Sequence, residues 1–258
     1  MSEFILTTAI KKMSRLKARK RVVQGGTSAG KTFGILPLLI DQAIKQPNLE
    51  VSVVSESIPH LRRGALKDFL KIMIMLNRYR DSQFNKSTLK YTFGNGSYIE
   101  FFSVDQPDKL RGARRNVLYV NEANNIPFDA YNQLAIRTSG DIWIDYNPTN
   151  EFWAHKQVLV DEDAELEVLT YKDNEALPES IIKEIEKAKE KAKTSTYWDN
   201  WWKVYVLPIG VKYKCQQMQG YFAMEWTGVI VTIQQVWLHY INGTTLTYLM
   251  RCFIKKVY

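Results

Sequence analysis

Short apolar runs alternate with amphipathic segments from residue 21 onward, and their order predicts the fold. An apolar strand at 21–24 is followed by a glycine-rich turn, an apolar helix at 31–45 and a second apolar strand at 51–55. This spacing is typical of a β-α-β unit, in which a helix joins two parallel strands. The pattern therefore predicts a parallel sheet that begins here.

The pattern continues through a helix, a hairpin and further alternating elements. Apolar positions at helical spacing predict a helix over 59–78. Alternating residues on both sides of Gly94-Asn95-Gly96 predict a β-hairpin built from 88–93 and 97–102. Further strands are expected at 116–120, 141–145 and 166–170, and further helices at 129–137 and 178–193. Strands that alternate with helices indicate an α/β fold, a largely parallel sheet flanked by helices with a β-hairpin insertion.

The composition supports a substantial core and argues against several other classes of protein. The chain has 258 residues and 45% hydrophobic content. It has no run of about twenty apolar residues and no signal-peptide order at its start, so we expect a soluble intracellular protein without a membrane partner. Its two cysteines, Cys215 and Cys252, lack metal-type spacing. That argues against both a zinc site and a disulfide scaffold.

The charge balance is compatible with a polyanionic partner but does not establish one. The net charge is +8, from 35 basic and 27 acidic residues. Seven Lys or Arg residues fall within 11–21. Such a run is either a solvated helix face or a surface that contacts nucleotide or DNA, and both interpretations stay open.

A phosphate-binding loop stands between the first strand and the first helix. Residues 25–32 fit the pattern G-x-x-x-x-G-K-[ST] at every fixed position. In this setting the backbone N–H groups and the helix N-terminus favour phosphate, Lys31 supplies positive charge to the β- and γ-phosphates, and Thr32 offers a hydroxyl to Mg²⁺. The motif narrows the expected fold to a P-loop NTPase of the ASCE, or RecA-like, class. The expected ATP-binding residues are Gly25, Gly26, Thr27, Ser28, Ala29, Gly30, Lys31 and Thr32.

Acidic groups at the end of a neighbouring strand complete a P-loop ATPase site. The apolar strand at 116–120 runs directly into Asn121 and Glu122. We expect Glu122 to be the general base that polarises the attacking water. Asn121 stands where an Asp is usual; its amide can bond a metal-bound water but brings no negative charge. Thr32 and the phosphates are then expected to contribute more to the binding of Mg²⁺.

Two other segments carry candidate site residues. Three arginines lie within 109–115, just before the acidic strand. Arg111 is the best candidate to meet the γ-phosphate or a neighbouring subunit's nucleotide, with a plain surface salt bridge as the alternative. The strand at 141–145 is followed by Asn147 and Thr149, which are candidates to sense the γ-phosphate. The alternative for these two is a turn built on Asn-Pro chemistry.

The order of these motifs resembles the ATPase domain of tailed-phage large terminases, in particular the PBSX-like group. The order is a P-loop, an Arg-Gly element, an apolar strand ending Asn-Glu-Ala-Asn, and then Asn-Pro-Thr, and the resemblance spans about residues 1–205. It implies that Lys31 and Thr32 bind phosphate and Mg²⁺ and that Glu122 is the catalytic carboxylate. It further implies that Arg111 lies near phosphate and that Asn147 belongs to a coupling motif.

The resemblance also implies a biological setting. Large terminases of this type hydrolyse ATP to move double-stranded DNA into a procapsid. The implied partners are double-stranded DNA, the terminase small subunit, the portal protein and further copies of the chain in a ring during packaging. The implied location is the cytoplasm of the bacterial host, transiently at the procapsid portal.

The last 53 residues depart from the pattern of that family. Large terminases of this type carry an RNase H-like nuclease domain with clustered Asp residues, whereas residues 206–258 contain no Asp. We therefore expect an ATPase domain at 1–205, including linker helices at 176–205, and a short tail at 206–258 without nuclease activity. One hypothesis is a frameshift near Tyr205, because 224–233 can be back-translated in a shifted frame to resemble the opening strand of the nuclease. The alternative is a short natural β-rich tail.

Three other functions remain open at this stage. The first is another nucleic-acid-dependent P-loop ATPase, such as a helicase-like enzyme, which strand separation would identify. The second is a small-molecule kinase, although a Glu directly after the acidic strand favours water as the acceptor. The third is a defective ATP-binding prophage remnant that binds nucleotide without productive turnover.

Overall fold

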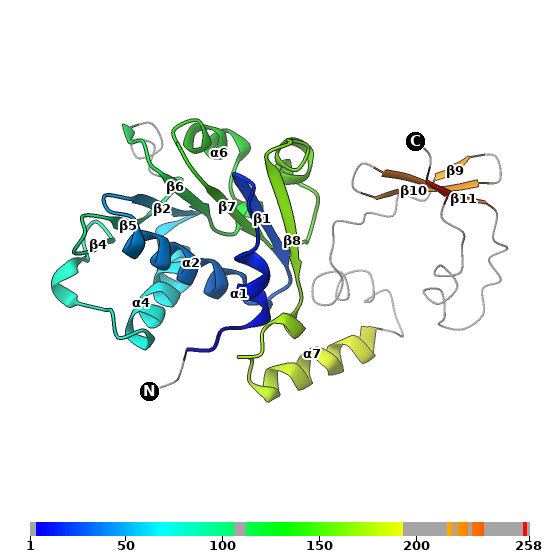
Figure 1. The fold of residues 1–258 in the computed structure, drawn as a ribbon. Coiled ribbons are helices and arrows are strands. Elements are labelled where there is room, and N and C mark those ends of the chain that lie inside the picture. Colours follow the sequence, from blue (N-terminus) through cyan, green and yellow to red (C-terminus); the bar gives the residue numbers. More distant parts are fainter. Residues whose placement is uncertain are drawn as a thin grey trace.

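The computed structural model describes residues 4–105 and 112–192, together with the backbone of four short strands between 216 and 256. Within residues 4–192 the strands form one eight-stranded sheet in the order β3-β4-β5-β2-β6-β7-β1-β8 (Figure 1). Six of these strands pair in parallel and β3 and β4 pair antiparallel at one edge. The expected α/β fold with a largely parallel sheet and a β-hairpin is confirmed.

The observed strands follow the apolar runs of the sequence to within a residue or two. Their bounds are β1 (Lys20–Gly25), β2 (Glu50–Ser55), β3 (Phe84–Asn85), β4 (Lys90–Thr92), β5 (Tyr98–Ser103), β6 (Val117–Val120), β7 (Ile142–Tyr146) and β8 (Ala164–Leu169). Side chains alternate between the two faces of the sheet, as the pleat requires. On β1, for example, Val23 belongs to one core cluster and Val22 to the other.

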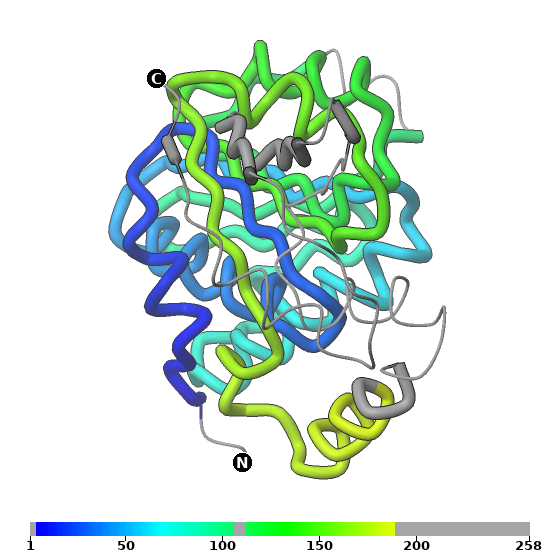
Figure 2. Tube along the Cα trace, turned by 90° about the vertical axis from the view of Figure 1, so that its right-hand side faces the viewer, coloured from blue at the N-terminus to red at the C-terminus, as the bar shows by residue number. Residues whose placement is uncertain are grey.

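Helices cover both faces of the sheet. Helices α1 (Thr8–Met13), α2 (Lys31–Lys45) and α4 (Ala65–Met75) pack over the face that contains Val23, and α6 (Phe128–Ala135) packs over the opposite face. Two further helices among the described residues are α3 (Ile58–Arg63) and α7 (Glu179–Ala192). Short helical turns lie at Asp81–Gln83, Ala123–Asn125, Ala154–Val158 and Tyr171–Asp173. Figure 2 shows β8 beside β1, with α7 at the bottom of the view.

The order of the central strands places β7 between the P-loop strand and the acidic strand. Lys20 of β1 lies opposite Ile142 of β7, and Ile142 lies opposite Leu118 of β6. These strands are parallel, so their carboxyl ends meet at one edge of the sheet, where ligands of open α/β sheets bind. Both the loop after β1 and the residues after β6 therefore reach the same crevice.

The helix expected over 59–78 is wrong as a single element. The chain forms α3 and then α4, and Gly64 stands between them with φ −104° and ψ −108°, outside the helical region. A glycine lacks the Cβ that restricts backbone angles, so it can interrupt an otherwise continuous apolar pattern. The break turns the chain between α3, which follows β2, and α4, which packs on α2.

The basic run at 11–21 is largely paired with acidic side chains. Lys12 Nζ lies 3.1 Å from Asp173, and Lys20 Nζ lies 2.6 Å from Asp161. Arg21 contacts Asp141 at 2.9 Å. For these three residues the contacts favour the interpretation of a solvated, ion-paired surface. Within the described part of the chain, no helix combines the length and the apolarity needed to cross a bilayer.

The tail is described as backbone at four strands. These are β9 (Gln216–Met218), β10 (Tyr221–Trp226), β11 (Val229–Gln234) and β12 (Lys255–Lys256), and they pair antiparallel in the order β12-β11-β10-β9. The domain boundary expected at residue 205 lies outside the described residues. The frameshift hypothesis stays a prediction.

Candidate functional site

The loop from Gly25 to Thr32 connects β1 to α2 in a conformation that depends on its glycines. Gly30 opens α2 with φ +81° and ψ 17°, the left-handed region that L side chains rarely adopt. At Gly25 a Cβ would lie 2.7 Å from the carbonyl oxygen of Leu169 on β8. A Cβ at Gly25 would therefore clash with β8, and a side chain at Gly30 would strain the backbone.

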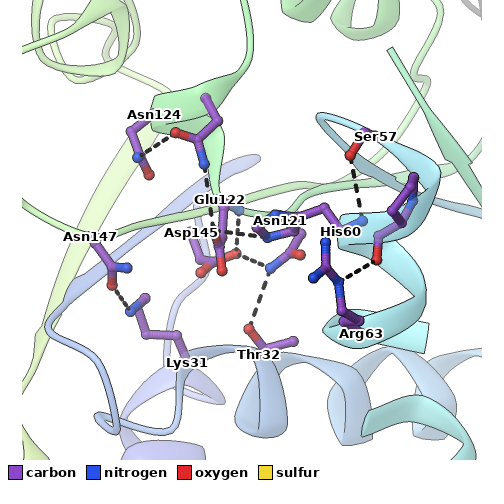
Figure 3. Close-up of polar contacts among 12 residues, drawn as sticks. Lys31, Thr32, Ser57, His60, Arg63, Asn121, Glu122, Asn124, Asp145 and Asn147 are labelled. Carbon is purple, nitrogen blue, oxygen red and sulfur yellow. Dashed lines mark hydrogen bonds and ion pairs between the residues drawn. The ribbon is translucent and has the colours of Figure 1, made fainter. Parts of the chain in front are cut away.

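Lys31 lies at the centre of this loop. Its side chain is 8% exposed, and Nζ donates to the carbonyl oxygens of Gly25 at 2.7 Å and Gly26 at 3.2 Å. It also donates to Asn147 Oδ1 at 2.8 Å (Figure 3). Burial lowers the pKa of Lys31, and the negative charges of Asp145 and Glu122 oppose that shift. The structure thus brings the expected phosphate-binding lysine and the expected coupling residue Asn147 into direct contact.

Thr32 and Asn121 also meet, as the sequence predicts for a Mg²⁺ site. Asn121 Nδ2 donates to Thr32 Oγ1 at 3.3 Å and to Asp145 Oδ1 at 3.0 Å. Asp145 is 1% exposed and lies on β7, and its Oδ1 also accepts from Tyr119 Oη at 2.9 Å. Burial raises the pKa of Asp145, while Lys31 and these hydrogen bonds act in the opposite direction.

Glu122 begins the turn that follows β6. Its backbone is left-handed, with φ 54° and ψ 54°, and its N–H donates to Asp145 Oδ1 at 3.1 Å. A non-glycine residue in this region is uncommon and is held there by its surroundings. Its carboxylate Oε2 lies 3.0 Å from His60 Nε2 of α3, which starts at the N-cap Ser57 (Figure 3). Glu122 is therefore at the edge of the crevice, with His60 and Asn125 as its side-chain partners.

Among the predicted site residues that the structure describes, Thr149 does not contact Lys31. Thr149 is exposed, and its N–H closes a short turn onto the carbonyl of Asn147 at 2.8 Å, which fits the turn interpretation for this residue. Arg111 lies outside the described residues. Arg115, from the same arginine-rich segment, is 2% exposed and packs inside the domain.

Arg115 supports the fold, and its removal tests that role. Its guanidinium donates to Ser52 Oγ at 3.1 Å and to the carbonyls of Leu134 at 3.2 Å and Ala113 at 3.1 Å. Arg115→Ala removes these three hydrogen bonds and the packing of a fully buried side chain, so we expect the free energy of unfolding to fall by about 2–4 kcal/mol. Urea denaturation measures this, with exposed Arg114→Ala as the control. A loss below about 0.5 kcal/mol, the range of ordinary surface substitutions, would contradict the assignment.

Three residues at this site were not predicted from the sequence: Asp145, His60 and Asn174. Asp145 appeared in the sequence as the polar end of an apolar strand, and its proximity to Asn121 follows from the strand order. His60 was assigned to a single long helix. Asn174 Nδ2 donates to the carbonyl of Ser28 in the P-loop at 2.9 Å. Asn174 lies within residues 1–205, the range of the resemblance, but nothing in the sequence indicated its partner.

The side chains at this edge fit a hydrated Mg²⁺ ion. A hydroxyl, an amide and a buried carboxylate meet at Thr32, Asn121 and Asp145, and oxygen donors of this kind are those that Mg²⁺ prefers. Mg²⁺ keeps several waters and is usually bound by few protein groups together with substrate phosphates. The donor set is therefore compatible with a nucleotide-bound Mg²⁺.

Comparison with known proteins gives one family and several similar structures. The family model described as "Phage terminase large subunit" matches residues 17–206. A structure of the large terminase from a thermophilic bacteriophage is 16% identical, with a TM-score of 0.63 over 83% of this chain and 57% of that one. The complex of that phage's large terminase with ATP-γ-S gives 15% identity and a TM-score of 0.62, over 89% of this chain and 64% of that chain.

A second solved structure corresponds to a smaller unit. The ATPase domain of the large terminase of Thermus phage P74-26 is 16% identical, with a TM-score of 0.57, over 76% of this chain and 91% of that chain. At these identities the likeness concerns the fold. The present chain spans 57% of the length of the first large terminase and most of the P74-26 ATPase domain. No curated protein sequence matches the chain.

Proposed function

Because the chain belongs to the phage terminase large subunit family, we propose that it is the ATP-hydrolysing motor part of such a subunit and moves double-stranded DNA into a procapsid. The observation that carries the proposal is the contact of Lys31 with Asn147 across the crevice, with Glu122 on the same sheet edge. The P-loop thus lies against both the acidic strand and the segment that follows β7.

The residues of the crevice have different roles in ATP hydrolysis. The P-loop backbone and Lys31 bind the β- and γ-phosphates. When bound, Mg²⁺ neutralises charge that develops on the phosphate oxygens, and Thr32 and Asn121 lie where they would hold it. Glu122 orients and polarises the attacking water. The complex of the thermophilic bacteriophage large terminase with ATP-γ-S supports nucleotide as the ligand of this fold.

Asn147 provides a route from the nucleotide to the rest of the domain. Its Oδ1 accepts from Lys31 Nζ, and it stands directly after β7 in the turn closed by Thr149. A γ-phosphate that draws Lys31 toward itself would compete with this bond. We infer that the hydrogen bond of Asn147 changes when the γ-phosphate is present and that this change alters the turn after β7. Thr149 takes part in that turn through its backbone N–H.

The proposed partners follow from the family. They are double-stranded DNA, a terminase small subunit, a portal protein and further copies of this chain in a ring, at the procapsid portal in the host cytoplasm. Arg111 remains the candidate for a contact with the γ-phosphate or with a neighbouring subunit's nucleotide. We propose that the ATPase domain ends near residue 205 and that the nuclease function is absent from this chain.

The proposed motor function predicts ATP hydrolysis that responds to DNA. We expect the full chain to release inorganic phosphate from ATP in the presence of Mg²⁺. Linear duplex DNA should raise the rate, because a packaging motor hydrolyses ATP as it moves along DNA. The measurement is continuous phosphate release with and without duplex DNA, with ADP quantified in parallel. Phosphoryl transfer to a small acceptor instead of water would support a kinase. DNA strand separation would support the helicase-like alternative.

A further inference from the structure

Strand β6 of this chain is followed by an uncharged residue at the position where a P-loop ATPase usually has an acid. Asn121 follows β6 at the point where the site needs an acid, and its Nδ2 is used as a donor to Thr32, Tyr119 and Asp145. An amide can bond a water in the shell of Mg²⁺ but does not offset its charge. The triphosphate supplies negative charge when it is bound, and any protein carboxylate at this site must come from a residue other than Asn121.

Asp145 lies on β7, the strand next to β6, at the register position beside Asn121. In the parallel register Val120 of β6 lies opposite Ile144 of β7, so the next residues of the two strands, Asn121 and Asp145, are neighbours. On its other side Asp145 lies opposite Val23 of β1, just before the P-loop. The carboxylate thus stands between the strand that leads to the phosphate loop and the strand that leads to Glu122.

The two carboxylate oxygens of Asp145 have different surroundings. Oδ1 accepts from Tyr119 Oη, Asn121 Nδ2 and the Glu122 N–H. Oδ2 is buried and has no donor among the described residues. Lys31 Nζ, whose positive charge acts on Asp145, donates its hydrogen bonds to Gly25, Gly26 and Asn147. A buried carboxylate oxygen without a donor is rare in folded proteins, because its desolvation is not compensated.

We propose that Asp145 supplies the negative charge of the metal site from β7, in place of Asn121 on β6, by accepting hydrogen bonds from the water shell of the nucleotide-bound Mg²⁺. This deepens the proposed function and depends on it. The donors on Oδ1 orient the carboxylate and leave Oδ2 as an acceptor without a donor among the described residues, on the residue that contacts Asn121. The same carboxylate holds the Glu122 N–H, so one side chain positions both the metal shell and the start of the catalytic turn.

Moving the carboxylate from residue 145 to residue 121 tests this assignment. The probe is a mant-labelled, non-hydrolysable ATP analogue bound to the full chain and titrated with Mn²⁺, with bound Mn²⁺ counted by electron paramagnetic resonance. Asp145→Asn is expected to raise the half-saturating Mn²⁺ concentration about 10- to 100-fold, the size typical of losing an outer-shell partner of a metal. The double variant Asn121→Asp with Asp145→Asn is expected to recover most of that loss, because it returns the charge from β6.

Matched controls separate a metal role from a structural one. Asp141→Asn makes the same change at the other end of β7, where Asp141 pairs with Arg21, and it should leave the Mn²⁺ midpoint unchanged. Analogue affinity in EDTA and the melting temperature monitor folding of each variant. A role limited to orienting Tyr119, Asn121 and Glu122 would lower the melting temperature without a selective change in the Mn²⁺ midpoint.

The outcomes distinguish the two levels of the proposal. An Mn²⁺ midpoint for Asp145→Asn within about twofold of wild type would overturn the assignment, since a lost metal partner changes affinity by far more. A loss that persists unchanged in the double variant, with folding intact, would also overturn it. Failure of the wild-type chain to bind the analogue even with Mn²⁺ would contradict the proposed function itself.

Discussion

Replacement of Glu122 by Gln is expected to lower ATP turnover by about 10²- to 10⁴-fold, the usual contribution of a positioned general base. Gln keeps the size of the side chain and loses the charge that polarises water. The backbone N–H bond from residue 122 to Asp145 does not depend on the side chain, so the turn should keep its conformation. Nucleotide affinity is expected to remain close to that of wild type. Steady-state phosphate release at saturating ATP measures the effect.

The matched control for this variant is Glu162→Gln, which makes the same change at an exposed position away from the crevice. It should hydrolyse ATP at the wild-type rate. If Glu122→Gln also kept its turnover within about twofold, a loss far smaller than a general base provides, Glu122 would have no role as the base.

Replacement of Lys31 by Ala is expected to weaken binding of ATP with Mg²⁺ by about 10- to 100-fold, because a hydrogen bond to a charged group contributes about 1.5–3 kcal/mol. The variant also removes the hydrogen bonds that Lys31 Nζ donates to Gly25, Gly26 and Asn147, so we expect its melting temperature to fall while the domain stays folded. Equilibrium titration with a mant-labelled nucleotide measures the affinity, and a thermal melt measures the folding.

Lys45→Ala provides the control for Lys31→Ala on the same helix. Lys45 ends α2 and forms an exposed ion pair with Asp41, so its loss should change nucleotide affinity very little. Equal affinity of wild type and Lys31→Ala for ATP with Mg²⁺, with Lys45→Ala as reference, would contradict the assignment of the phosphate site.

The parts of the fold that sequence predicted well are those with a local physical signal. The strand at 21–24, the glycine pattern of 25–32 and the helix at 31–45 each carry their own periodicity or motif, and each is present in the structure. The hairpin around Gly94-Asn95-Gly96 likewise follows from its turn residues. The helix over 59–78 failed because a single glycine changes the backbone without changing the apolar spacing.

The parts that sequence could not predict depend on which strands become neighbours. Asp145 looked like an ordinary strand-end residue until the structure placed β7 between β1 and β6. His60 meets Glu122 because Gly64 separates α3 from α4. Contacts of this kind join residues far apart in the chain, and periodicity reports only on near neighbours. The roles assigned to Glu122, Asn147 and Arg111 remain predictions for the experiments above.

The order of the strands also has a consequence for how the protein reaches its native state. The strand that carries the phosphate loop, β1, pairs with β7 and β8, so Lys20 lies opposite Ile142 and Ala164. A ribosome must therefore synthesise most of the domain before β1 can hydrogen-bond to either neighbour. Closure of such long loops slows folding, because chain entropy is lost before the pairing contacts form. We expect the nucleotide crevice to form late during biosynthesis, after β2 has already paired with β5.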